Sequence, residues 1–201
     1  MAKVENGSEA SSSSGIEPLA EGPRKYALGL LMLIYVLNFL DRQVVNILAE
    51  PIKVELGLAD WQLGALTGLA FALFYTVLGL PIARLAERAD RVKIISVAVG
   101  VWSAFTVACG MAGNFTQLLL ARIGVGVGEA GCTPPAHSLI SDYTPAEKRT
   151  SAIASYSMGI PLGSLAGMAL GGMIADSYGW RVAFFVAGAP GVLLALAAWF
   201  T

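Results

Sequence analysis

YALGLLMLIYVLNFLDRQVVNILA, residues 26–49, decides the fold of this chain. As a helix, this run is long enough to cross the roughly 30 Å hydrocarbon core of a bilayer, yet it carries Asp41 and Arg42. A charge at the centre of a bilayer costs about 2.5 to 3.5 kcal/mol on the insertion scale. We therefore expect a membrane-spanning helix whose charges pair with others or line a cavity that contains water.

The rest of the chain is similarly apolar. Hydrophobic residues make up 56% of it and charged residues 13%, and the mean hydropathy is +0.67, which is unlike a soluble globular domain. Windows of spanning length predict six helices, at 26–49, 62–82, 93–112, 115–141, 151–175 and 182–200. We therefore predict an all-α integral membrane protein with several passes.

The first 23 residues differ from this pattern, because serine, glycine and proline interrupt any periodicity. We predict a disordered tail over 1–23, followed by a helical bundle over 24–201. The tail lacks the basic start and apolar run of a cleavable signal, so the first span is expected to stay in the mature protein. Most Lys and Arg in the loops fall on the side of the N-terminus, which predicts a cytoplasmic N-terminus in a cell (inner) membrane.

A second pair of charges, Arg122 and Glu129, lies in the predicted span 115–141. A rise of about 1.5 Å per residue places Arg122 and Asp41 at the same depth. Pro134 and Pro135 follow Glu129 and predict a kink in this span. Because the charges fall in the first members of two groups of three spans, we predict two three-helix repeats of inverted topology, a pattern typical of transporters.

The roles of these charges follow from burial. Asp41 and Arg42 point about 100° apart on a helix, so one is expected to pair and the other to meet a substrate. We expect Asp41 or Glu129 to take up a proton, since desolvation favours the neutral carboxyl group. The alternative is a permanent structural ion pair.

Glycine recurs at every fourth position in the predicted span 151–175, from Gly159 to Gly171. Such a stripe lets two helix backbones approach closely, either as a static seam or as a sliding surface. Both alternatives require a partner helix.

The sequence contains no residue pattern that indicates an enzyme or a metal site. Cys109 and Cys132 lie inside predicted spans and are expected to be small packing residues. His137 has no Cys or carboxylate at ligand spacing, so we expect no metal and no cofactor. The sequence also lacks a nucleophile with a nearby base, which argues against an enzyme.

Several motifs carry a resemblance to a known family. The loop Arg84–Lys93 resembles the cytoplasmic signature loop of the major facilitator superfamily, although Ala83, Glu87, Asp90 and Val92 depart from its pattern. The run 122–130 resembles the Arg-x-x-x-Gly-x-Gly pattern of the same superfamily. Together with the runs 37–42, 61–64 and 179–181, it is similar to the Spinster branch, whose members are lipid transporters.

The resemblance implies the N-terminal half of a twelve-helix transporter fold. The sequence ends at Thr201 after six predicted spans, which leaves a piece of a longer chain or two assembled copies. We favour the piece, because the glycine stripe and the buried charges are expected to need a partner whose sequence need not be identical. A C-terminal six-helix half is then an expected partner.

The resemblance also implies roles for residues. Proton coupling falls to Asp41 and Glu129, and an anionic headgroup would meet Arg42 or Arg122. The acyl tail would meet the aromatic residues of the second span, which are Phe71, Phe74 and Tyr75. A conformational latch corresponds to Glu87, Arg88 and Arg91, with a second cluster at Asp142 and Arg149. The alternative for these loop charges is plain solvation.

The expected function is secondary active transport of an amphiphilic anionic lipid, similar to sphingosine-1-phosphate or a lysophospholipid, by alternating access and with proton coupling. The alternative is a proton-coupled carrier of a small organic anion or sugar. The expected partners are the substrate, protons, membrane lipids and the second half of the transporter, and no nucleic acid.

Overall fold

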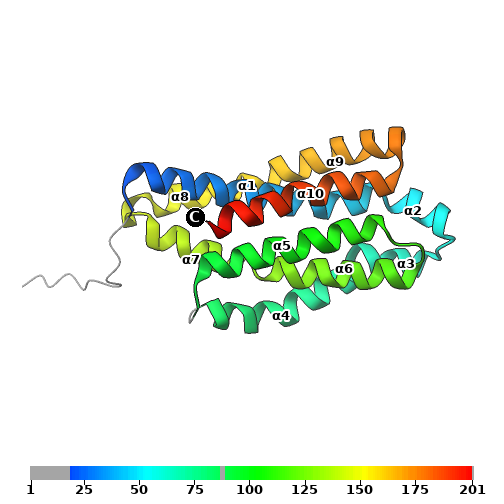
Figure 1. The fold of residues 1–201 in the computed structure, drawn as a ribbon, viewed down its shortest axis with the longest axis horizontal. Coiled ribbons are helices and arrows are strands. Elements are labelled where there is room, and N and C mark those ends of the chain that lie inside the picture. Colours follow the sequence, from blue (N-terminus) through cyan, green and yellow to red (C-terminus); the bar gives the residue numbers. More distant parts are fainter. Residues whose placement is uncertain (1–18, 87–88, 201) are drawn as a thin grey trace, which may run out of the picture.

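The computed structural model describes residues 19–86 and 89–200, and Figure 1 shows its helices running lengthwise in one bundle. The first, third and last spans are single helices, α1 (Glu21–Ile47), α5 (Arg91–Gly110) and α10 (Trp180–Trp199). The second span joins α3 (Asp60–Gly64), a π turn (Ala65–Leu69) and α4 (Ala70–Ala86). The fourth and fifth spans are α6 (Phe115–Ala130) with α7 (Thr133–Tyr143), and α8 (Arg149–Ser157) with α9 (Gly159–Tyr178). The short α2 (Ala49–Leu56) connects the first two spans.

The fourth predicted span is interrupted near its middle. Within the described residues, five stretches are long and apolar enough to cross a membrane, and the predicted span 115–141 is not among them because it breaks between Ala130 and Thr133. Pro134 and Pro135 lie in the first turn of α7, where the missing backbone N–H groups would have had no partner in the helix. The predicted kink is therefore an interruption of the helix at Gly131 and Cys132, two residues after Glu129.

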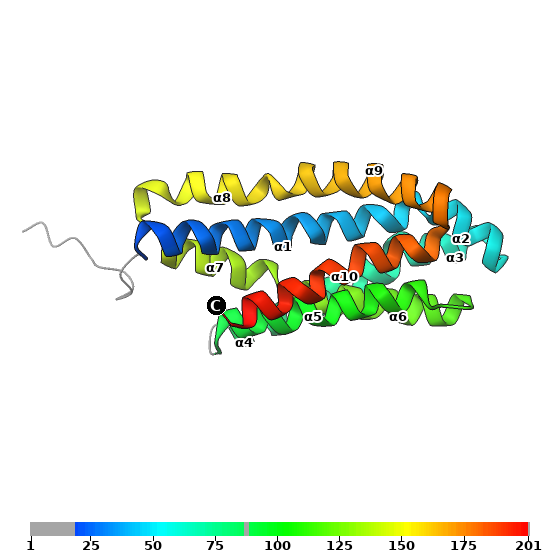
Figure 2. The ribbon, with the colours of Figure 1, turned by 45° about the horizontal axis from the view of Figure 1, so that its top comes forward.

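The helices pack in pairs that support the predicted repeats. In Figure 2, α1 lies along α9 while α5 lies along α10, and α4 packs on α6. If each of the first three spans corresponds to the span three places later, α1 corresponds to α6, α4 to α9 and α5 to α10. The α1–α9 pair then corresponds to the α6–α4 pair, and the α5–α10 pair corresponds to itself. This is the pairing that two structurally related three-helix repeats produce.

The glycine stripe of α9 packs against α1. A Cβ atom on Gly163 would lie 2.2 Å from the carbonyl oxygen of Val36, and one on Gly167 would lie 2.6 Å from that of Leu40. Only glycine allows the two backbones to approach this closely. The stripe therefore has its partner inside the chain, and our expectation that it needs a second half was wrong. Hydropathy alone could not show that the first and fifth spans are neighbours.

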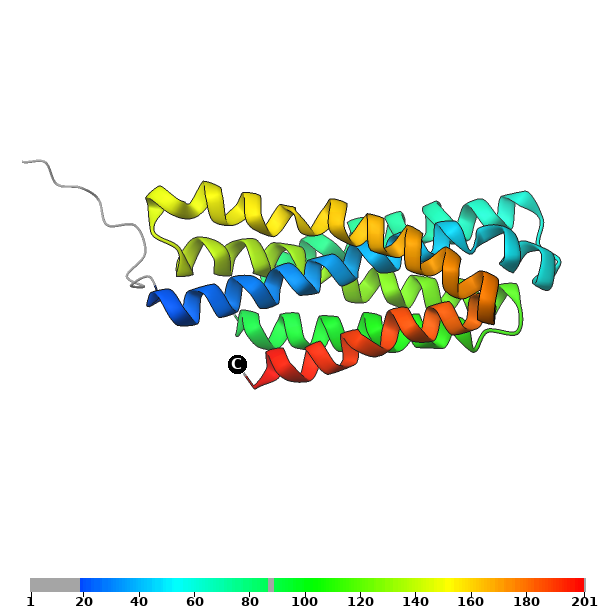
Figure 3. The same cartoon turned by 90° about the horizontal axis from the view of Figure 1, so that it is seen from above.

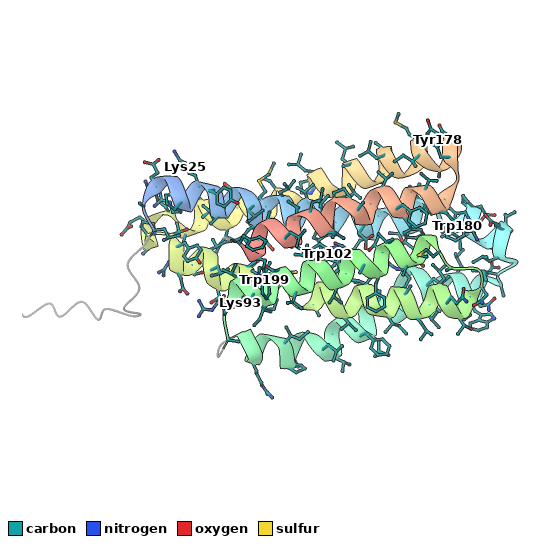
Figure 4. The ribbon with its side chains drawn as sticks, viewed as in Figure 1. Lys25, Lys93, Trp102, Tyr178, Trp180 and Trp199 are labelled. Carbon is teal, nitrogen blue, oxygen red and sulfur yellow. The ribbon has the colours of Figure 1, made fainter. Side chains whose placement is uncertain are left out.

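Basic and aromatic side chains mark the two ends of the bundle. Lys25 and Lys93 lie at one end and Tyr178 and Trp180 at the other (Figure 4). The start of α1 and the end of α10 share the Lys25 end, as six crossings require (Figure 3). The tail predicted over 1–23 falls mainly outside the described residues and stays a prediction.

A polar cluster at the Trp180 end ties the loop after α1 to the start of α10. The carboxylate of Glu55 accepts a 2.6 Å hydrogen bond from Nε1 of Trp180 and pairs with Arg181. The hydrogen bond from Arg181, followed by the one from Trp180, lowers the pKa of Glu55 below its ordinary value. The cluster therefore holds the ends of three spans together, since Arg181 also donates to the carbonyl oxygen of Ala112 at 3.2 Å.

Candidate functional site

Two ion pairs connect α1 to α6 in the interior of the bundle. Asp41 and Arg122 approach to 3.5 Å, and both side chains are almost completely buried. This distance is longer than that of a charge-assisted hydrogen bond, which is about 2.7 to 2.9 Å. The contact confirms that the two groups lie at the same depth.

The second pair joins Arg42 to Glu129. Nε of Arg42 donates to Oε2 of Glu129 at 2.7 Å, and the side chain of Glu129 is 0% exposed. Arg42 retains 26% of its side-chain exposure. Asp41 and Arg42 are therefore both paired within the chain, which corrects the expectation that one of them has no protein partner and that the pairing needs a second half. The partners were missed because the sequence does not show that α1 and α6 are adjacent.

Three aromatic rings surround the guanidinium group of Arg42. Its Cζ atom lies 5.1 Å from the ring centroid of Phe39, 4.8 Å from that of Phe71 and 5.0 Å from that of Tyr75. The ring of Phe71 also lies 5.6 Å from Arg122, so one ring contacts both guanidinium groups. Cation–π contacts of this kind stabilise a positive charge in apolar surroundings.

The predicted aromatic residues are not equivalent. Phe71 and Tyr75 stack on each other with centroids 5.6 Å apart, and both contact Arg42. Phe74 is half-buried on the same helix. Among the described rings, it does not contact either guanidinium group.

Glu129 has one oxygen that is not used. Within the described part of the chain, Oε1 of Glu129, both carboxylate oxygens of Asp41, and Nε and Nη1 of Arg122 are buried without a hydrogen-bond partner. A buried carboxylate that is only half satisfied is costly to keep charged, and a proton on the free oxygen would remove this cost. The arrangement can therefore exchange a proton and, when it does, free Arg42 for another anion.

Sequence reasoning missed an aromatic wall that continues from this site toward the Lys25 end. Tyr35 lies edge-on to Phe39 and stacks on Tyr156 at 4.2 Å. Tyr156 in turn contacts His137 at 5.4 Å. The spacing of Tyr35, Phe39 and Arg42 places them on one face of α1, and this spacing was the signal available in the sequence.

The predicted latch is partly described. Arg91 at the start of α5 pairs with Asp142 near the end of α7. Nε of Arg149 donates to the backbone oxygen of Thr144 at 3.2 Å. The other two predicted latch residues, Glu87 and Arg88, lie outside the described residues. The pair therefore joins the third span to the fourth at the Lys25 end.

Comparison with known proteins places the chain in a family. The family model of the Major Facilitator Superfamily matches residues 31–201, so the chain belongs to this superfamily of membrane transporters. An MFS-type efflux pump of Mycolicibacterium smegmatis is 39% identical over 176 residues, which are 87% of this chain and 41% of that protein. The chain thus spans about two fifths of this relative.

Relatives with other names match at lower identity. A probable L-galactonate transporter of Escherichia coli is 31% identical over 170 residues, covering 85% of this chain and 37% of that protein. A probable sphingolipid transporter, spinster homolog 1 of Arabidopsis thaliana, is 30% identical over 174 residues, covering 78% of this chain and 35% of that protein.

The crystal structure of a bacterial homolog of the human lysosomal transporter Spinster, inward-facing and unoccupied, has a similar fold. It superimposes with a TM-score of 0.86 at 44% sequence identity, over 90% of this chain and 43% of that chain. The fold is therefore that of six spans of a Spinster-like transporter.

Proposed function

We propose that the transporter containing this chain moves an amphiphilic anionic lipid, similar to sphingosine-1-phosphate or a lysophospholipid, across a membrane by alternating access. The observation that carries the proposal is the partly exposed Arg42, enclosed by aromatic rings and paired with a buried carboxylate. The names of the Spinster-like relatives support the class of substrate.

The headgroup binds at Arg42. A guanidinium group matches phosphate with two parallel hydrogen bonds, which an ammonium group cannot do in the same fixed geometry. Arg122 is only 1% exposed and is committed to Asp41, so it supports the site without receiving the headgroup. Phe39, Phe71 and Tyr75 then contact the first carbons of the acyl tail.

Proton coupling follows from competition for Arg42. The four charges of the two ion pairs cancel, and a proton on Glu129 leaves one positive charge at Arg42. Removing one partner of a buried ion pair costs about 3 to 5 kcal/mol, and an incoming phosphate offsets this cost. The proton and the anion therefore favour each other's binding, while Asp41 keeps Arg122 neutralised.

The membrane orientation is part of the proposal. Lys25 and Lys93 lie at the same end of the bundle (Figure 4), and basic residues are retained on the cytoplasmic side. The N-terminus is then cytoplasmic, in the cell membrane. The Arg91–Asp142 pair acts with the loop before α5 as a latch between conformations. A C-terminal six-helix half completes the cavity.

Vesicles reconstituted with the full-length transporter test the substrate class. We expect accumulation of a radiolabelled lysophospholipid to rise when a proton gradient is imposed, and Arg42→Gln to abolish it. Preference for a tailless substrate, such as glycerol phosphate or a sugar acid, would contradict the lipid assignment. That outcome would favour the small-anion carrier, which the match to the L-galactonate transporter makes the second candidate.

A further inference from the structure

A groove outside the transport site opens between α4 and α5. It has a volume of about 430 Å³, and its lining is almost entirely apolar. Ile82 of α4 forms one wall, Val97 and Val101 of α5 form the other, and Val127 of α6 lies between them. The groove exists because α4 and α5 both pack on α6 and, within the described residues, contact each other little.

The floor of the groove is backbone. A Cβ atom on Gly131 would lie 2.8 Å from the Cβ of Ala98, and one on Gly128 would lie 2.6 Å from the backbone nitrogen of Trp102. These two glycines let the end of α6 and the residue after it lie directly against α5. The depth of the groove is therefore set by close helix packing.

Charged and aromatic groups mark the groove at one end only. Lys93 and Asp90 line the mouth together with Trp199 at the end of α10, and Figure 4 shows Lys93 and Trp199 at the same end of the bundle. Tryptophan is enriched where a membrane meets water. From Lys93 to Val101 the groove follows α5 for about 12 Å, close to the roughly 15 Å depth of one leaflet.

The charge at the mouth suits a phosphate. Oδ1 of Asp90 accepts hydrogen bonds from the backbone nitrogens of Val92 and Lys93, so this carboxylate caps α5. The ammonium group of Lys93 lies 3.4 Å from Oδ2 of Asp90, and its side chain is 61% exposed. An exposed pair of this kind is weak, and the ammonium group can also bind a phosphate oxygen.

We propose that this groove binds one acyl chain of a membrane glycerophospholipid, whose phosphate lies beside Lys93. The occupant comes from the leaflet at the Lys93 end. It stays separate from the transported molecule, because the groove and the Arg42–Glu129 pair lie on different faces of α6. The bound chain fills the space between α4 and α5, and it thereby couples the second span to the lipid around the protein.

Native mass spectrometry of the detergent-purified, full-length transporter tests the proposal, with phosphatidylglycerol added back as the probe. We expect Val97→Trp to fill the groove and to reduce phospholipid retention about tenfold, as does Lys93→Gln through loss of a charge-assisted contact. Val97 is 54% exposed, so tryptophan fits there without disturbing the core. The matched controls are Leu193→Trp, on an exposed face of α10, and Lys25→Gln, at the same end of the bundle.

Two results would overturn the proposal. One is equal retention in the groove variants and in their controls, when thermal unfolding shows that all of them are folded. The other is loss of the retained lipid in Arg42→Gln, since this would place it in the transport site. As a positional check, a phosphatidylglycerol with a photoreactive acyl chain should label residues 94–101 and 127–131.

Discussion

Replacing Glu129 by glutamine removes the charge that holds Arg42 and keeps the shape of the side chain. The neutral amide resembles the protonated carboxyl group, so the variant fixes the site in the state that the proposed mechanism reaches by taking up a proton. We expect Glu129→Gln to bind an anionic lysophospholipid more tightly than the wild type at pH 7.5, and with little dependence on pH.

The magnitude follows from the Arg42–Glu129 contact. At 2.7 Å it is a charge-assisted hydrogen bond, worth about 1.5 to 3 kcal/mol, whereas a neutral one is worth about 0.5 to 1.5 kcal/mol. The difference of about 1 to 2 kcal/mol corresponds to a gain in affinity of about 5- to 30-fold. Because the Arg42 side chain is 26% exposed, solvent screening moves the expectation toward the lower end.

The assay is equilibrium binding of a radiolabelled lysophosphatidate to the purified full-length transporter at pH 5.5 and 7.5. Arg42→Gln serves as the control, because it removes the group for which the phosphate and the carboxylate compete. The double variant should lose the gain, since Arg42 and Glu129 act as one unit. Equal affinity and an equal pH slope in Glu129→Gln and the wild type would refute the competition.

Three further changes test the packing, the loop cluster and the latch. Gly163→Ala should destabilise the protein by about 1 to 3 kcal/mol in detergent, because its Cβ would meet Val36; Gly172→Ala, whose Cβ has its nearest neighbour at 3.8 Å, should have little effect on thermal unfolding. The lowered pKa of Glu55 stabilises the fold above its ordinary value of 4.5, and this contribution is lost as the pH falls through the folded-state pKa. Glu55→Gln should therefore lose less stability at low pH than the wild type, whereas the control Glu50→Gln should behave like the wild type. An equal loss of stability at low pH in Glu55→Gln and in the wild type would contradict this. Asp142→Asn frees Arg91 and should increase the labelling, by a thiol reagent added at the Lys25 end, of cysteines introduced into the cavity. The same increase in the control Asp176→Asn, at the other end of the bundle, would show that the effect does not come from the latch.

The sequence predicted the elements better than their neighbours. Apolar length located the spans, and the prolines after Glu129 predicted the break between α6 and α7. Helical rise placed Asp41 level with Arg122, because depth in a membrane depends on position along the chain. The pairing of α1 with α9 is a tertiary property that hydropathy does not contain, so the glycine stripe was assigned a partner outside the chain.

The candidate site was predicted only in part, because its residues could be identified from the sequence but their partners could not. Buried charges stand out in an apolar sequence, and Asp41, Arg42, Arg122 and Glu129 were all identified. Their partners depend on the rotation of α1 against α6, which the sequence does not specify. The ring of Phe39 escaped notice because aromatic residues are common in membrane helices, and only its distance from Arg42 distinguishes it.

Proton uptake on binding is the most direct test of the central claim, that an anion and Glu129 compete for Arg42. It can be measured as the pH change when lysophosphatidate is added to the full-length transporter in weakly buffered detergent solution near neutral pH. The proposed mechanism predicts net uptake of protons by the wild type and none by Glu129→Gln. Binding of the lipid without proton uptake, or with proton release, would contradict it.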